Sequence, residues 1–83
     1  MQYVYVLRDV EGTLYTGCTS DLRKRIVLHN AGKVKSTKRR GPLELIYYEA
    51  YKNQKDAYAR EQYFKSGWGR AYVKKVLRNT LHD

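Results

Sequence analysis

Cysteine and histidine are scarce in this chain of 83 residues, which has one cysteine, Cys18, and two histidines, His29 and His82. A single cysteine cannot form a disulfide within the chain, and no group of Cys and His residues has the spacing of zinc ligands. The sequence therefore excludes a disulfide-stabilised scaffold and a structural zinc site. Cys18 falls in a predicted strand, where we expect it to pack as a small apolar side chain.

Long apolar stretches and the common enzyme motifs are also missing. No segment approaches the roughly 18 consecutive apolar residues of a membrane span, and the N-terminus lacks the basic region and cleavage site of a signal peptide. We therefore expect a cytoplasmic protein without membrane contact. The sequence has no phosphate-binding glycine loop, no local signature of a Ser-His-Asp set and no helical pair of metal-binding histidines.

Acidic residues are few, since eight Asp and Glu stand against 17 Lys and Arg, which gives a net charge of +9. This excess of positive charge indicates a polyanionic partner, and nucleic acid is the expected one. The single proline and six glycines exclude fibrous and low-complexity classes, and 42% hydrophobic with 30% charged residues is typical of a globular chain. We expect one domain over residues 1–83 with a small core.

The order of predicted elements indicates a mixed fold. Residues 3–7 and 14–19 are rich in aromatic and β-branched types and flank turn-forming residues, which predicts a β-hairpin. A third strand is predicted over residues 43–50. Helices are predicted over residues 21–31, from Asn53 to residue 66, and over residues 70–81. The expected fold is a small α/β domain in which a three-stranded antiparallel sheet is flanked by three helices.

Apolar positions predict which side of each helix faces the sheet. The two sets at helical spacing are Leu22, Ile26 and His29 in the first helix, and Val73, Val76 and Leu77 in the last. Ser20 is the expected cap of the first helix, with Asp21 at its positive end. Trp68 lies between two glycines, and we expect it to anchor a helix junction in the core, with base stacking as the alternative.

Residues 33–40 form a basic loop without an apolar period. Its five positive charges are Lys33, Lys35, Lys38, Arg39 and Arg40. Clustered charges of this kind release counterions from nucleic acid, so we predict that this loop contacts the nucleic-acid backbone. The alternative interpretation is a mobile, solvated loop.

Several short motifs occur together in a meaningful order. Tyr3-Val4-Tyr5 begins the first strand, and Tyr15-Thr16-Gly17 lies ten residues after Tyr5. Arg25 and His29 follow on the first helix, and Ala59-Arg60-Glu61 lies on the second. The set resembles the GIY-YIG endonuclease superfamily, in particular its small standalone single-domain members, over nearly the whole chain.

The chain departs from the family pattern at a few positions. Tyr3 and Val4 stand where the first motif has Gly and Ile, and Thr16 replaces the Ile of the second motif. Residues 73–76 contain no asparagine to match the one that many members carry after the metal-binding glutamate, and Asn79 follows a few positions late.

The resemblance implies a role for each matched residue. Tyr5 would lie near the scissile phosphate as general base toward the attacking water, and Tyr15 would bind or polarise alongside it. Arg25 would neutralise charge on the phosphate, and His29 would assist proton transfer or orientation. Glu61 would hold a single divalent cation, Mg²⁺ or another such as Mn²⁺.

Each of these residues also has a structural alternative. Tyr5 and Tyr15 suit any half-buried strand pair, and Arg25 suits a solvated helix face. His29 could interact with the helix dipole, and Glu61 could pair with a lysine four residues on. Gly17 would allow the backbone to approach nucleic acid closely, or it would mark a β-bulge.

These observations predict a metal-dependent endonuclease that hydrolyses phosphodiester bonds in nucleic acid, with DNA as the expected substrate, in repair or recombination-type processing. One alternative is a basic nucleic-acid-binding module whose nuclease site has decayed. Another is an interaction subunit whose site is completed by a protein partner.

Overall fold

The strand that contains residues 3–7 lies at the centre of the sheet. The computed structural model describes residues 1–82. Its elements, in chain order, are β1 (Gln2–Arg8), β2 (Leu14–Thr19), α1 (Leu22–Asn30), the 3₁₀ turn η1 (Lys35–Thr37), β3 (Glu44–Tyr51), α2 (Gln54–Lys65), α3 (Gly67–Val76) and α4 (Arg78–His82). The strands are antiparallel neighbours in the order β2-β1-β3. The predicted hairpin, third strand and α/β class are confirmed.

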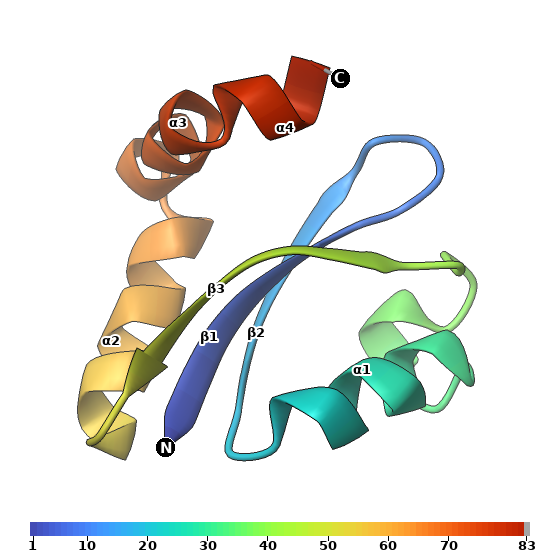
Figure 1. The fold of residues 1–83 in the computed structure, drawn as a ribbon, viewed down its shortest axis with the longest axis horizontal. Helices are drawn as coiled ribbons and strands as arrows, with labels where there is room; N and C mark the ends of the chain where they lie inside the picture. The colour runs from blue at the N-terminus through green and yellow to red at the C-terminus, as the bar shows by residue number, and fades with distance from the viewer. Residues whose placement is uncertain (83) are drawn as a thin grey trace.

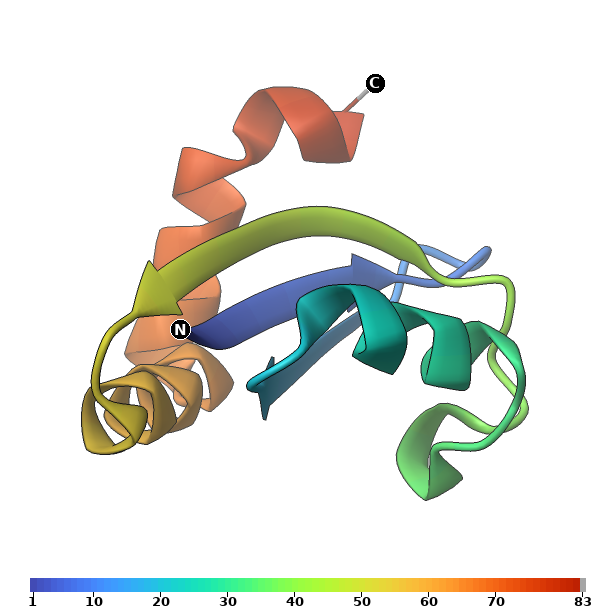
Figure 2. The same ribbon diagram turned by 60° about the horizontal axis from the view of Figure 1, so that its bottom comes forward.

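Helices lie on both faces of the sheet, α2 and α3 on one face and α1 on the other (Figures 1 and 2). Successive residues of a strand point to opposite faces, so Val4 and Val6 pack against α2 and α3, while Tyr5 and Leu7 pack against α1. All four of these β1 side chains are almost fully buried. The first motif therefore places Tyr5 beneath α1, on the face that also receives the basic loop.

Helix α1 forms where the sequence predicts it, although the cap differs. Asp21, rather than Ser20, is the N-cap, because its carboxylate accepts a hydrogen bond from the Lys24 backbone N–H at 3.1 Å. Leu22 and Ile26 pack on the sheet and His29 is buried, as their shared spacing indicates. After the helix, Gly32 adopts a φ of +72°, which a side chain disfavours, and the chain turns into the basic loop.

The C-terminal segment differs from the single helix predicted over residues 70–81. Helix α3 begins at Gly67, because Ser66 both follows α2 and caps α3 through a hydrogen bond from the Gly69 backbone N–H at 3.1 Å. The chain turns at Leu77, and α4 follows. Val73 and Leu77 are buried but Val76 is 47% exposed, so the predicted stripe is wrong at Val76. No helix within residues 1–82 has the length and apolar character needed to cross a membrane.

The junction between α2 and α3 is packed through a glycine and not through the tryptophan beside it. Trp68 is 84% exposed, so the expectation that it anchors the junction in the core is wrong. A Cβ atom at Gly69 would lie 2.7 Å from the Phe64 Cα and closer still to the Tyr63 carbonyl. The two helices meet at the backbone of Gly69, which leaves Trp68 on the outside.

A partly buried ionic cluster fixes α2 against β3. The Glu49 carboxylate accepts hydrogen bonds from Tyr47 and Tyr51 and from the Arg60 guanidinium, the last at 2.8 and 3.2 Å. The Arg60 group also lies over the Phe64 ring, 4.7 Å from its centroid. Arg60 therefore serves the packing of α2, which fixes the orientation of the neighbouring Glu61.

Candidate active site

Tyr5 reaches the edge of the sheet because its neighbour in β2 has no side chain. Gly17 is its partner in the β1–β2 register. A Cβ atom at position 17 would lie 3.0 Å from the Tyr5 Cε1 and closer still to Cζ and the hydroxyl oxygen. The Tyr5 ring thus occupies the space above Gly17, with its hydroxyl over the Gly17 Cα. The approach of nucleic acid to Gly17 stays a prediction.

The Tyr5 hydroxyl begins a chain of polar contacts that crosses α1 to the basic loop. Its oxygen lies 2.8 Å from His29 Nε2, and His29 Nδ1 lies 2.6 Å from the Thr37 hydroxyl. Arg25 Nε–H donates to the Tyr5 oxygen at 3.4 Å. Arg25 and His29 are one turn apart on α1, so both reach the same hydroxyl.

Burial keeps the central groups of this chain neutral. Desolvation raises the pKa of Tyr5, although the hydrogen bond and positive charge of Arg25 oppose the rise. Desolvation and the charge of Arg25 both lower the pKa of His29 below 6.5. At neutral pH Tyr5 is therefore a phenol and His29 an uncharged imidazole. A free tyrosinate is disfavoured as a base.

Tyr15 lies on the exposed side of the same cluster. Its ring meets the His29 ring edge to face, with centroids 5.3 Å apart, and its hydroxyl lies 2.6 Å from the Ser36 hydroxyl. Tyr5 and His29 are each about 1% exposed, whereas Tyr15 and Arg25 are only partly buried. An approaching anion would therefore meet Tyr15 and Arg25 before it reached Tyr5.

Two residues of the basic loop belong to the cluster although the sequence did not single them out. Ser36 and Thr37, in η1, contact Tyr15 and His29 respectively. Val34 and Thr37 are buried, so the loop packs on the domain at these two residues and is solvated only at the others. The sequence does show two adjacent hydroxyl residues in an otherwise basic segment. It could not show that they contact Tyr15 and His29, because those residues are distant in the sequence.

The cations of the loop point outward around this anchor. Lys33, Lys35, Lys38 and Arg39 are exposed, and Arg40 pairs with the Asp9 carboxylate at 3.5 Å. Asp9 also accepts hydrogen bonds from the turn between β1 and β2, which ties the end of the loop to the hairpin. The loop that contacts Tyr15 and His29 thus carries four exposed positive charges.

Glu61 approaches the cluster from the opposite face of the sheet. It lies on α2, which packs against β1 and β2. Desolvation is the main cause of the raised pKa of both Tyr5 and Cys18, and the negative charge of Glu61 adds to both, which is consistent with α2 packing next to β2. One oxygen accepts from the Lys65 ammonium at 2.9 Å, as the structural alternative for Glu61 predicts. No hydrogen bond joins Glu61 to Tyr5 or Arg25.

The donors around Glu61 fit a hydrated cation better than a fully protein-bound one. Among residues 1–82, no three His, Cys, Asp or Glu side chains gather to hold a metal ion. Mg²⁺ is commonly bound by one or two carboxylates, with waters and substrate phosphate oxygens completing its shell. Glu61 Oε1 makes no hydrogen bond within the described part of the chain, so one oxygen is available for such a ligand role.

The comparisons with known proteins found a matching family model and several similar proteins. A family model described as the GIY-YIG catalytic domain matches residues 1–75. A UPF0213 protein of Clostridium perfringens (strain 13 / Type A) is 47% identical over 80 residues, which are 95% of this chain and 76% of that protein. A UPF0213 protein of Streptococcus pyogenes serotype M3 (strain SSI-1) is 50% identical over 64 residues, which are 76% of this chain and 70% of that protein.

A solved structure resembles the fold as well. The solution NMR structure of a UPF0213 protein from Bacillus halodurans superposes with a TM-score of 0.57 at 34% identity, covering 92% of this chain and 85% of that one. The GIY-YIG domain is a nuclease domain, which implies that it binds a nucleic-acid substrate. The motif residues Tyr5, Tyr15 and Gly17 lie within the matched region, and the chain belongs to the GIY-YIG nuclease superfamily, among its small single-domain UPF0213 members.

Proposed function

We propose that this chain, as a single domain over residues 1–83, is a divalent-metal-dependent endonuclease that hydrolyses phosphodiester bonds in DNA during repair or recombination. The observation that carries the proposal is the polar chain from the Tyr5 hydroxyl through His29 to Thr37, with Arg25 beside the same hydroxyl. It combines a proton pathway and a phosphate-binding cation at one point. The predicted cytoplasmic location stays a prediction.

In this proposal Tyr5 passes a proton on and does not act as a free tyrosinate. When the His29 proton is on Nδ1, Nδ1–H donates to the Thr37 hydroxyl and Nε2 accepts the Tyr5 O–H. The attacking water forms a bond to phosphorus and gives its proton to the Tyr5 oxygen, while the Tyr5 proton moves to His29 Nε2. The bond from phosphorus to the leaving sugar oxygen breaks, and that oxygen takes a proton from solvent.

The surrounding side chains stabilise the charge that develops on the phosphate. Arg25 is partly exposed and lies at the Tyr5 hydroxyl, so a phosphate bound to its guanidinium is held beside the group that accepts the water proton. Tyr15 and the loop cations border the same approach. A divalent cation at Glu61 would neutralise charge on the nonbridging oxygens.

The test is cleavage of labelled DNA by the wild-type protein and by Glu61→Ala and Tyr5→Phe variants. The substrates are single-stranded, duplex, flap and four-way-junction DNA, with an RNA of the same sequence. We expect cleavage with Mg²⁺ or Mn²⁺, loss of cleavage in EDTA, and a decrease of at least about 10²-fold in both variants. Lys65→Met, which removes the ion-pair partner and leaves the carboxylate, is the matched control and should still cleave.

A non-catalytic binding module is the second candidate. Tyr5 and His29 are almost fully buried and Glu61 pairs with Lys65, and both features also suit a domain that binds nucleic acid without cutting it. Such a module would bind every substrate with an affinity that falls steeply with salt, and no divalent cation would produce cleavage.

Cleavage that persists in folded Glu61→Ala and Tyr5→Phe proteins would refute the proposed mechanism.

A further inference from the structure

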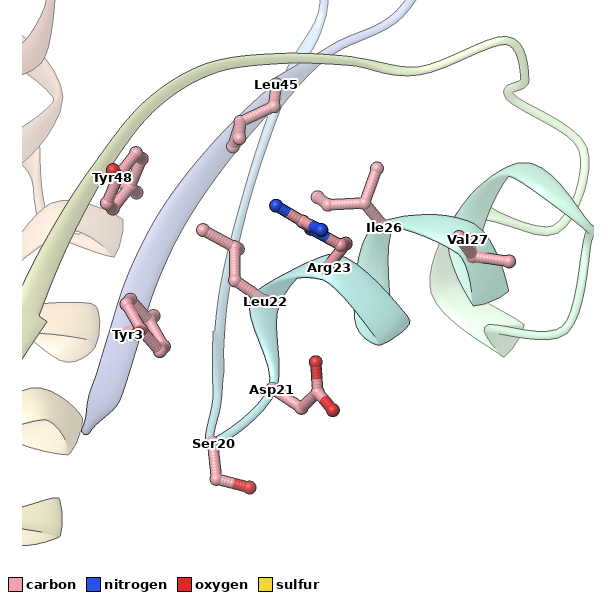
Figure 3. A pocket seen from close by; sticks show the side chains of 9 residues that line it. All are labelled: Tyr3, Ser20, Asp21, Leu22, Arg23, Ile26, Val27, Leu45 and Tyr48. Atoms are coloured by element: carbon pink, nitrogen blue, oxygen red, sulfur yellow. The ribbon is translucent and has the colours of Figure 1, made fainter.

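A pocket of about 550 Å³ lies between α1 and the β1 and β3 side of the sheet (Figure 3). Its floor is formed by Tyr3 and Tyr48, and its helical wall by Leu22, Arg23 and Ile26. The pocket is separate from the candidate active site, because Arg25 and His29 of α1 turn toward β2, whereas Arg23 lines the β3 side. The proposed cleavage mechanism gives this pocket no role.

Two tyrosines give the pocket an aromatic floor without an evident structural role. The Tyr3 and Tyr48 rings meet edge to face, with centroids 6.1 Å apart. Tyr48 is 52% exposed, and within residues 1–82 neither hydroxyl forms a hydrogen bond. An exposed aromatic side chain that lines a concavity is more informative than a singly exposed one.

The charge around the pocket favours an anionic ligand with a flat apolar part. Arg23 lines the wall, and Figure 3 shows its guanidinium directed into the space between α1 and the sheet. The Asp21 carboxylate at the rim is engaged with the Lys24 backbone N–H as the helix cap. With a net charge of +9 over the chain, the ligand that fits is a nucleotide, whose base stacks on a phenol ring while its phosphate faces the cation.

The base must be unpaired, because a paired base has its faces covered by its neighbours in the duplex. Tyr48 is the β3 partner of Tyr5, and Gly17 is the β2 partner of Tyr5. Two strand spacings, about 10 Å, therefore separate the backbone of Tyr48 from the backbone of Gly17, over which the Tyr5 hydroxyl lies. Unpaired nucleotides next to a cleaved phosphate can span this distance around α1.

We propose that this pocket binds an unpaired nucleotide by stacking its base on Tyr48, and so selects substrates with a single-stranded segment beside the scissile bond. The proposal rests on the proposed nuclease function for its biological meaning, but the binding itself requires no cleavage. A base can come from DNA or from RNA, and the stacking chemistry is the same for both.

The experiment measures binding in EDTA, so that it is independent of catalysis. Fluorescence anisotropy titrations compare a labelled single-stranded oligonucleotide with the blunt duplex of the same sequence, for wild type and Tyr48→Ala. We expect Tyr48→Ala to lower the affinity for the single strand by roughly 5- to 150-fold, and the affinity for the duplex by less than about two-fold. Tyr58→Ala, which removes a tyrosine of similar exposure on α2, is the matched control and should change neither.

A second set of titrations removes bases from the oligonucleotide and leaves the protein side chain in place. Replacing bases of the oligonucleotide by abasic sites should weaken binding to wild type and have little effect on Tyr48→Ala, because the stacking partner is already absent. Tyr48→Phe should retain the wild-type affinity. Tyr48→Leu, which keeps apolar volume in the pocket and removes the ring, replaces Tyr48→Ala if that variant does not fold.

The outcomes separate the two proposals. Equal losses for single strand and duplex, or an abasic effect that is the same with and without Tyr48, would overturn the pocket proposal even if the protein cleaves DNA. A selective loss would support it even if the protein cleaves nothing. The same titration with an RNA oligonucleotide identifies the source of the nucleotide, since the strand bound at least about tenfold more tightly is the one that the pocket serves.

Discussion

Replacing Gly17 with alanine should displace the Tyr5 ring from the candidate active site. The added Cβ would come within 3.0 Å of the Tyr5 Cε1 and closer to its hydroxyl oxygen, an approach that real Cβ atoms essentially never show. The ring cannot yield easily, because it is about 1% exposed and its hydroxyl contacts His29 at 2.8 Å. Overpacking costs about 1–3 kcal/mol, and the displaced hydrogen bond costs about 1 kcal/mol more.

This magnitude sets both a thermal and a catalytic expectation. A domain of this size loses about 4–8 °C in Tm for each kcal/mol, so Gly17→Ala should melt at least roughly 8 °C below wild type while remaining folded at 25 °C. A displacement of the hydroxyl by about 1 Å should decrease the cleavage rate about 10²-fold. Binding of DNA should change little, because the exposed loop cations are untouched.

The assay is a circular dichroism melt combined with single-turnover cleavage and anisotropy binding. Gly67→Ala is the matched control, because a Cβ at that position meets no atom within 4 Å. A Gly17→Ala protein with the Tm and cleavage rate of Gly67→Ala would refute the inference that the Tyr5 ring needs the space left by Gly17.

Three further predictions concern proton binding, the loop hydroxyl and the loop cations. The pKa of His29 in the folded protein lies below 6.5, so the unfolded chain binds a proton more readily than the folded one. The free energy of unfolding should therefore decrease as the pH falls below about 6.5. Urea unfolding at pH 8 and 5.5 measures this decrease, which should be smaller in His29→Gln. Thr37→Val removes the buried partner of His29 Nδ1 and should cost about 1–3 kcal/mol of stability and lower cleavage, whereas Thr37→Ser should keep both near wild type. Lys35→Ala and Lys38→Ala should each reduce the slope of log affinity against log salt by about 1 if the residue neutralises one phosphate.

Each of these predictions has a contradicting result. A pH dependence of unfolding that is identical in wild type and His29→Gln would show that His29 is not the group that titrates. Equal behaviour of Thr37→Val and Thr37→Ser would remove the hydroxyl from the polar chain. Unchanged salt slopes in both lysine variants would place the nucleic acid elsewhere on the surface.

The local sequence pattern predicted most of the helices and strands. It failed where one residue takes part in two neighbouring helices. The alternation in residues 3–7 predicts a strand with two different faces, and the structure has both. Ser66 was interpreted only as the end of one helix, although its side chain also caps the next. Trp68 was expected in the core because large aromatic side chains are usually buried, but the close contact at that junction belongs to Gly69.

The candidate site also has residues that could be predicted from the sequence and residues that could not. The resemblance to the GIY-YIG superfamily implied Tyr5, Arg25 and His29 as one group, and helical spacing alone indicated only that Arg25 and His29 lie one turn apart. Ser36 and Thr37 could not be predicted, because their contacts to Tyr15 and His29 depend on how the basic loop folds back over α1. The position of Glu61 close to β2 likewise depends on how α2 packs on the opposite face of the sheet.

The sequence by itself indicated the α/β class and the strongly basic character of the chain, since these follow from composition and from spacing along the chain, and the resemblance of its motifs to the GIY-YIG superfamily implied the family and the candidate site residues Tyr5, Tyr15, Arg25, His29 and Glu61. Only the tertiary structure decided that Tyr5 passes through the space at Gly17, that burial raises the pKa of Tyr5 and lowers that of His29, and that Tyr3 and Tyr48 form the floor of a separate pocket. The physical reason is that burial and contact between distant segments are set by the packing of helices on both faces of the sheet, which no local pattern encodes.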